Sequence, residues 1–127
     1  MAMTLLPLLL LLEATSPDTP PPGISKSDMR DLQKQAEAQV KQCWHVPKTR
    51  SNIATTVRVY YNRDGTLAAE PQVLKQTIAP EYYVVVVREI AQRAKRAISL
   101  CAPIRLPADR YSGGWEDIEL TLHTRKQ

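Results

Sequence analysis

Two segments of the chain alternate between apolar and polar residues, and they constrain the fold more than any other feature. Across residues 53–61, Ile, Thr, Val, Val and Tyr occupy the odd positions, and Ala, Thr, Arg and Tyr the even ones. Residues 115–123 alternate again, with Ile118, Leu120 and Leu122 on one side. A period of two is typical of a strand that buries one face and exposes the other to water. We therefore expect both segments in a sheet that is covered on one side.

A turn and a further strand follow the first alternating segment. Asp64 and Gly65 readily adopt the positive φ angles that hairpin turns require. The next strand is then expected from Thr66 to about Lys75. Pro71 lies inside this span and cannot donate a ladder hydrogen bond, so the strand should form the sheet edge or bulge there.

Two helices complete the pattern. The first should begin near Ser25 or Ser27, which are good N-caps, and run to about Gln42 with apolar residues every three or four positions. The second is expected over residues 80–100. Four consecutive valines at 84–87 favour a strand instead, because β-branched side chains are stiff. The basic residues that follow alternate with apolar ones at helical spacing and favour the helix.

These elements predict a single α+β domain over residues 25–127. It has two layers, a three-stranded antiparallel sheet in the order 2-1-3 and two helices packed on one face, in the chain order helix, strand, strand, helix, strand. A length of 127 residues with 43% apolar content suffices for one core and leaves little for a second. Trp44 and Trp115 are expected to be buried anchors of that core rather than ligand platforms.

The first 24 residues differ in composition from this domain. Residues 1–14 contain a leucine-rich run and are predicted to be a signal peptide for export. Residues 15–24 contain four prolines and are predicted to form an extended linker. The leucine-rich run is too short for a helix across a hydrocarbon core of about 30 Å, so we expect no transmembrane anchor. A truncated start of an inner-membrane-anchored protein and a buried N-terminal segment are the alternatives.

Over residues 40–122 the sequence resembles the C-terminal domain of TolA, which is related in fold to that of TonB. The resemblance implies the fold predicted above, a periplasmic location, and protein binding rather than catalysis. The transmembrane helix and the long helical middle region of TolA have no counterpart here, so we expect a stand-alone copy of the terminal module. The motifs that carry the resemblance are Cys43-Trp44 followed by Pro47, Asp64-Gly65-Thr66-Leu67, Pro71-Gln72-Val73, Arg93-Ala94, Arg96-Ala97, Cys101-Ala102-Pro103, Leu106-Pro107, Tyr111, Trp115, Ile118, Leu120 and Leu122.

Cys43 and Cys101 are the only cysteines, and both fall at predicted helix ends. In an exported domain this arrangement predicts a structural disulfide that ties the two helices together. The alternative is a metal site that adds His45 and His123, but zinc sites usually carry closely spaced ligands on both halves, and Cys101 has no such neighbour. A Cys-His nucleophile would lack a third, orienting residue. We therefore predict no metal, no cofactor and no enzymatic activity.

The last strand is expected to lie beside the first, so that its far side presents unpaired backbone groups to an extended partner. The residues assigned to this partner-binding edge are Asp117, Glu119, Thr121 and His123. The resemblance implies the same mode, because domains of the TolA family bind Tol-system proteins, TonB-box segments, phage adsorption proteins and colicins by extending the sheet. Asp117 and Glu119 are expected to pair with Arg58 across the sheet rather than to perform acid–base catalysis.

A net charge of +4 leaves a second function open. Arg88, Arg93, Lys95 and Arg96 could bind nucleic acid or anionic components of the envelope, although no nucleic-acid motif surrounds them. Such binding would weaken steeply with salt, whereas backbone pairing is comparatively tolerant of salt. A secreted inhibitor or a structural envelope protein is a further alternative.

Overall fold

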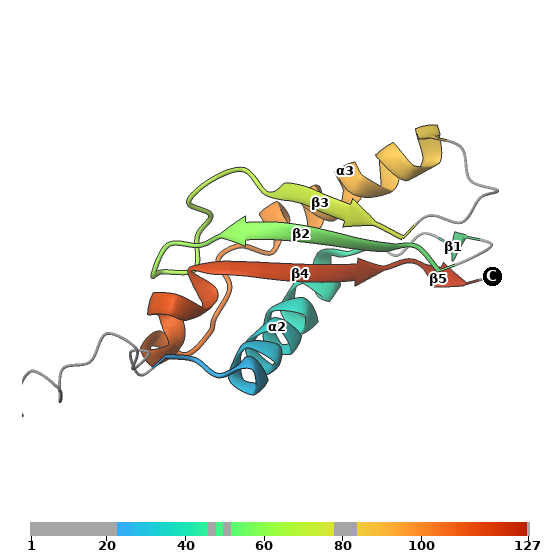
Figure 1. Ribbon diagram of the computed structural model, residues 1–127. Coiled ribbons are helices and arrows are strands. Elements are labelled where there is room, and N and C mark those ends of the chain that lie inside the picture. Colours follow the sequence, from blue (N-terminus) through green and yellow to red (C-terminus); the bar gives the residue numbers. More distant parts are fainter. Residues whose placement is uncertain (1–22, 46–47, 50–51, 78–83, 127) are drawn as a thin grey trace, which may run out of the picture.

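Strand β2 (Ala54–Tyr60) is the centre of a three-stranded antiparallel sheet, with β3 (Gln72–Gln76) on one side and β4 (Asp117–His123) on the other (Figure 1). The computed structural model describes residues 23–45, 48–49, 52–77 and 84–126. The predicted α+β class with a three-stranded antiparallel sheet and helices is confirmed.

The pairing between β2 and β4 extends over the full length of both strands. Ala54 lies opposite His123 and Tyr60 lies opposite Asp117, without a register shift between them. The residues whose side chains point to the covered face alternate with exposed or half-buried ones, except at Thr56, which is 8% exposed on the other face, so the predicted period of two is confirmed at the remaining positions. The buried set comprises Thr55, Val57, Val59, Ile118, Leu120 and Leu122.

Strand β3 is shorter than the sequence predicted. The expected strand over residues 66–75 is interrupted, because Leu67 forms an isolated antiparallel bridge with Tyr61 and continuous pairing with β2 begins only at Gln72. Asp64 Oδ1 accepts a hydrogen bond of 3.0 Å from the backbone N–H of Thr66 within the turn that precedes this bridge. The gap in the pairing lies between Ala68, whose N–H donates to the carbonyl of Tyr60, and Gln72.

Strand β3 lies at the edge of the sheet, as the presence of Pro71 predicted. Pro71 immediately precedes the strand, where its missing N–H interrupts no ladder bond. The register with β2 shifts between Thr56 and Val57, so this ladder is irregular while the ladder to β4 is regular.

Helix α2 (Lys26–Val40) begins where the sequence predicted. The Oγ of Ser25 accepts a hydrogen bond of 3.0 Å from the backbone N–H of Asp28, which satisfies one of the donors that a first helical turn leaves unpaired. A short 3-10 segment, η2 (Lys41–Cys43), continues the helix. The buried face of α2 comprises Leu32, Ala36 and Val40.

Helix α3 (Val84–Leu100) contains the run of valines, so the strand alternative for that run is wrong. Burial of the apolar stripe further along α3 outweighs the weak helix preference of β-branched residues, which is typically a few tenths of a kcal/mol each. The predicted helix start before Val84 lies outside the described residues. Both helices join the inner face of the sheet in one apolar cluster, with α2 along the β4 side and α3 along the β3 side (Figure 1). The buried stripe of α3 comprises Ile90, Ala94, Ala97 and Ile98.

Both tryptophans are buried core anchors, as predicted. Trp115 is 1% exposed, and its indole N–H donates to the carbonyl oxygen of Pro107 at 2.7 Å. This contact fixes two short segments, η3 (Ala108–Arg110) and η4 (Tyr111–Trp115), directly before β4. Trp44 is 5% exposed and follows η2.

A disulfide joins Cys43 at the end of η2 to Cys101, the residue that follows α3, with a Cα–Cα distance of 5.8 Å. The predicted pairing of these two residues is therefore present. Because each sulfur is bonded to the other, neither is a thiolate that could bind a metal or attack a substrate. A two-stranded parallel ladder of β1 (Lys48–Thr49) and β5 (Arg125–Lys126) completes the structure beyond β4.

None of the helices within the described ranges has the length and apolar content that a membrane span requires. The predicted signal peptide over residues 1–14 and most of the predicted linker over residues 15–24 lie outside those ranges.

The disulfide should contribute a large part of the stability. It closes a loop with a sequence separation of 58, for which loss of chain entropy in the unfolded state corresponds to about 4 kcal/mol. The double variant Cys43→Ser/Cys101→Ser should therefore unfold at a much lower urea concentration, with a loss of about 4 kcal/mol in the free energy of unfolding. An unchanged urea midpoint in the variant would show that the bond does not stabilise the fold.

Gly65 should tolerate no side chain. Its φ is +86°, and a Cβ there would overlap the backbone carbonyl of Ile104, whose N–H donates to the carbonyl of Gly65 at 3.0 Å. Gly65→Ala is expected to lower the free energy of unfolding by more than about 2 kcal/mol, because two packed backbone segments must separate. Gly113→Ala is the matched control, since φ is +74° but a Cβ would meet no described atom within 4 Å. It should cost only about 1 kcal/mol, and equal losses in urea titrations would contradict this explanation.

Candidate functional site

The regular ladder between β2 and β4 determines which backbone groups of β4 point away from the sheet. The N–H of Thr124 donates to the carbonyl of Ile53 at 3.0 Å, and the N–H of Tyr61 donates to the carbonyl of Glu116 at 3.1 Å. Hydrogen-bonded pairs alternate with non-bonded pairs in an antiparallel ladder, so the even-numbered residues of β4 bond to β2. The residues that direct both backbone groups outward are Asp117, Glu119, Thr121 and His123.

This outer edge is partly covered by the protein's own side chains. Glu37 of α2 accepts a hydrogen bond of 2.7 Å from the backbone N–H of Thr121. The indole N–H of Trp44 donates to the carbonyl oxygen of His123 at 3.0 Å. The prediction that the backbone groups are unpaired along the whole of residues 115–123 is therefore wrong at these two points. Side chains from the end of α2 and the residue after η2 occupy the positions that a partner strand would otherwise contact.

The first half of the edge differs from the second. No hydrogen bond from any described residue reaches the outward backbone groups of Asp117 or Glu119. A hollow of about 320 Å³ lies beside them. Its lining comes from α2 and from the outer face of the sheet: Met29, Gln33, Arg58, Leu74, Asp117 and Glu119. Space and unpaired backbone groups thus coincide at this end of β4.

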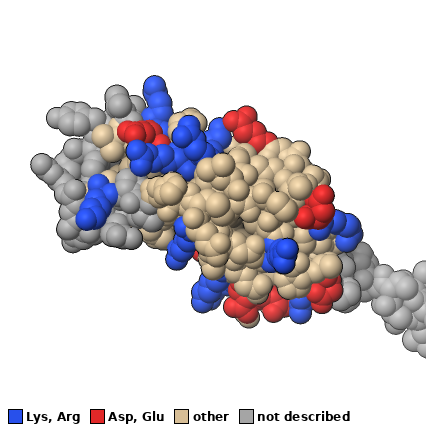
Figure 2. Space-filling view, turned by 180° about the vertical axis from the view of Figure 1, so that it is seen from behind, with Lys and Arg blue, Asp and Glu red and all other residues tan. Residues whose placement is uncertain are grey.

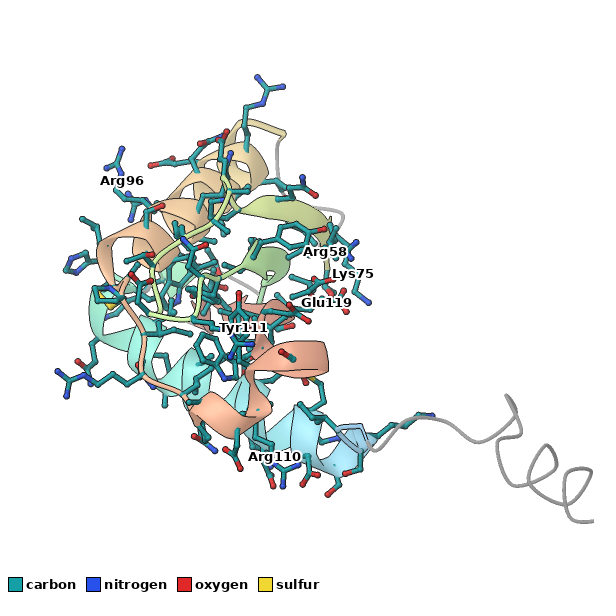
Figure 3. The ribbon with its side chains drawn as sticks, turned by 90° about the vertical axis from the view of Figure 1, so that its left-hand side faces the viewer. Arg58, Lys75, Arg96, Arg110, Tyr111 and Glu119 are labelled. Atoms are coloured by element: carbon teal, nitrogen blue, oxygen red, sulfur yellow. A yellow bond between two sulfur atoms is a disulfide. The ribbon has the colours of Figure 1, made fainter. Side chains whose placement is uncertain are left out.

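The outer face of the sheet beside this edge is polar and charged (Figure 3). Arg58 donates two hydrogen bonds to Asp117, of 2.9 and 2.7 Å, which confirms the predicted pairing of these residues. The Arg58 guanidinium lowers the pKa of the Asp117 carboxyl, mainly through this hydrogen bonding. The predicted pairing of Glu119 with Arg58 is wrong, because Glu119 lies directly opposite Arg58 in the ladder but its carboxylate has no ion pair among the described residues. It points to solvent and is available to a cation on a partner.

The two remaining side chains of the predicted site have structural contacts. The hydroxyl of Thr121 lies 3.1 Å from the hydroxyl of Thr56 on the neighbouring strand. Nδ1 of His123 lies 3.1 Å from the side-chain amide of Asn52. The structure therefore brings all four predicted residues to one edge, but only Asp117 and Glu119 keep both outward backbone groups open, since the N–H of Thr121 and the carbonyl of His123 are covered.

The basic residues of α3 belong to a different surface from the outer face of the sheet. The view from behind shows Lys and Arg side chains gathered at the α3 end of the molecule (Figure 2). Two of the four proposed anion-binding residues already have carboxylate partners. Arg93 pairs with Glu89 at 3.1 Å and Lys95 pairs with Glu70 at 2.6 Å. These pairs reduce the charge that α3 offers to a polyanion.

Sequence reasoning missed the two residues that cover the β4 edge. Glu37 lies on the face of the predicted helix that was expected to be solvated. No neighbouring residue indicates that it contacts a strand residue 84 positions later in the chain. Trp44 was expected in the core, where it lies, but its indole N–H had no predicted acceptor. A buried indole usually finds an acceptor for its N–H, and this general rule was the only available signal.

Removing the Glu37 carboxylate should destabilise the protein measurably. Glu37→Ala leaves the half-buried N–H of Thr121 without an acceptor and should lower the free energy of unfolding by about 1–2 kcal/mol. Glu37→Gln keeps a carbonyl oxygen in the same position and should lose less than half as much. Urea denaturation of both variants measures the difference, and identical losses would mean that the hydrogen bond is not the stabilising element.

Comparison with known proteins assigns the chain to a family. Residues 26–110 match the model of the uncharacterised conserved protein family UCP034077. The matched segment includes both helices, β2, β3 and the disulfide, and it ends before β4. No curated protein and no solved structure gives a significant match. Since the family model covers more than half of the sequence, the chain belongs to the uncharacterised conserved protein family UCP034077.

Proposed function

We propose that this protein is a protein-binding module of the cell envelope that accepts an extended segment of a partner as an additional strand beside β4. The partner strand pairs with the backbone of Asp117 and Glu119, at the end of the strand that Glu37 and Trp44 leave uncovered. The observation that carries the proposal is the coincidence of outward, unpaired backbone groups with an adjacent hollow of about 320 Å³. Unpaired groups at a sheet edge are a ready template for another chain.

Backbone pairing of this kind gives affinity without a deep pocket. Each new N–H to carbonyl bond replaces bonds to water and contributes about 1 kcal/mol, so several bonds are needed together with side-chain contacts. The exposed carboxylate of Glu119 supplies one such contact and favours a basic residue on the added strand. The hollow beside Met29 has room for a neighbouring side chain of the added strand, which points to the opposite face from that basic residue.

We also propose a relationship to the TolA and TonB C-terminal domains. What supports it is the sequence resemblance over residues 40–122, together with the α+β class and the three-stranded antiparallel sheet. We accordingly propose Tol-type or Ton-type envelope proteins as partners, with phage or colicin segments as competitors for the same edge.

The disulfide supports a location outside the reducing cytosol. Bonds of this kind persist in oxidising compartments, of which the bacterial periplasm is one. We propose export to the periplasm on this ground. A catalytic role has no support from the cysteines, because both are held in the disulfide. Among the described residues no group of three or more His, Cys, Asp or Glu side chains is arranged to hold a metal.

Strand addition can be tested at Glu119, whose N–H points away from the β2 ladder. Glu119→Pro removes that donor without breaking a bond to β2 and should abolish capture of periplasmic partners by the immobilised protein. Glu119→Ala is the matched control, because it removes the side chain and keeps the N–H, so it should retain most of the binding. Circular dichroism should show that both variants keep the fold.

The two variants separate backbone pairing from side-chain recognition. If Glu119→Pro captures the same proteins as the unmodified chain, strand addition at β4 is wrong. If Glu119→Ala loses binding as fully as Glu119→Pro, the carboxylate rather than the backbone recognises the partner, and the added-strand mechanism is equally wrong.

A further inference from the structure

A second hollow lies beside the disulfide, away from the β4 edge. It has a volume of about 310 Å³ and lies between Cys43 and His45 on one side and residues 89–100 of α3 on the other. A volume near 300 Å³ is at the lower end of the range for ligand sites, which extends to roughly 1,000 Å³. It suits a few side chains of a peptide. The lining comprises Cys43, His45, Glu89, Gln92, Arg93, Arg96, Ala97 and Leu100.

The walls of this hollow are held in place before any ligand arrives. Cys43 lines one wall and is bonded to Cys101, which follows directly after Leu100 of the opposite wall. Ala97 is 1% exposed and joins the hollow to the core. A preformed site loses less conformational freedom on binding than a mobile one.

The hollow has an exposed apolar rim. Leu100 is 63% exposed and, with Leu74 of β3, is one of two large apolar side chains that the described part of the protein exposes. A single exposed leucine is common on protein surfaces and means little alone. Here it adjoins a recess with a small-residue floor, so an aliphatic side chain of a ligand can contact Leu100 and Ala97 together.

The charged groups of the lining are unbalanced. Arg93 is paired with Glu89 at 3.1 Å, the one carboxylate of the lining. Arg96, which projects from α3 away from the sheet (Figure 3), has no carboxylate partner among the described residues. Its planar guanidinium can donate two parallel hydrogen bonds to a carboxylate. The amide of Gln92 and the imidazole of His45 add hydrogen-bonding groups around it.

We propose that this hollow binds a short segment of a partner protein in which an aspartate or glutamate adjoins a large aliphatic residue. Arg96 binds the carboxylate, and Leu100 with Ala97 contacts the aliphatic side chain. A nucleic acid is a poorer match. Among the described residues, neither Tyr nor Trp lines the hollow for base stacking, and the His45 imidazole is the one ring in the lining. The carboxylates that pair with Arg93 and Lys95 reduce the charge facing a phosphate chain.

Selection from a displayed library of random seven-residue peptides, against the intact oxidised protein, tests this inference. The selected peptides should carry an acidic residue beside Leu, Ile or Val. In fluorescence anisotropy, Arg96→Glu and Leu100→Ser should each weaken a selected peptide at least tenfold. Lys75→Glu makes the same charge change on the exposed outer face of the sheet and should alter the affinity less than twofold (Figure 3).

Several outcomes would overturn the inference. These are the absence of any selected binder, peptides without an acidic residue, or undiminished affinity in Arg96→Glu. Tighter binding of a twelve-nucleotide oligo(dT) than of the selected peptides, lost in the same variant, would assign the site to nucleic acid instead. Glu119→Pro should leave peptide binding here unchanged, so failure at this hollow and failure at the β4 edge are distinguishable.

Discussion

The seven-pair register between β2 and β4 is the constraint on which the rest of the structure depends, because it determines the direction of both side chains and backbone groups. A shift of β4 by one residue would move Ile118, Leu120 and Leu122 from the core to water. The same shift would also exchange the backbone groups that bond to β2 with those that point outward. Core packing and the composition of the exposed edge are thus two consequences of one pairing.

The disulfide connects this edge to the rest of the fold. It fixes Cys43 against the end of α3, and the next residue, Trp44, then reaches the carbonyl of His123. Glu37 lies two turns earlier on α2 and reaches the N–H of Thr121. Two side chains from one part of the chain therefore cover the last half of β4. The first half remains open, so an added strand has a defined place to pair rather than a choice of several registers.

Much of this fold follows from local sequence signals. The alternation in residues 53–61 and 115–123, the serine cap of α2 and the spacing of the two cysteines each led to the element that the structure contains. The start of β3 did not follow, because pairing with β2 breaks off after Leu67 and resumes only at Gln72, and no periodicity in the sequence marks that gap. The contacts of Glu37 and Trp44 with the β4 edge did not follow either. They join residues about eighty positions apart in the chain, and the packing of the helix against the sheet brings these residues together.

The two surfaces proposed for partners differ in chemistry. The β4 edge offers backbone groups beside an unpaired carboxylate, and the hollow at α3 offers an unpaired guanidinium beside an exposed leucine. One protein could therefore contact two segments of opposite charge, or two partners.

Amide hydrogen exchange along β4 in the unbound protein, measured by NMR, tests the central claim most directly. The account predicts slow exchange at Ile118, Leu120 and Leu122, which bond to β2, and at Thr121, which Glu37 covers. Glu119 should exchange rapidly, because its N–H meets only solvent. Protection of Glu119 equal to that of Thr121 would show that the edge is already closed and would contradict strand addition there.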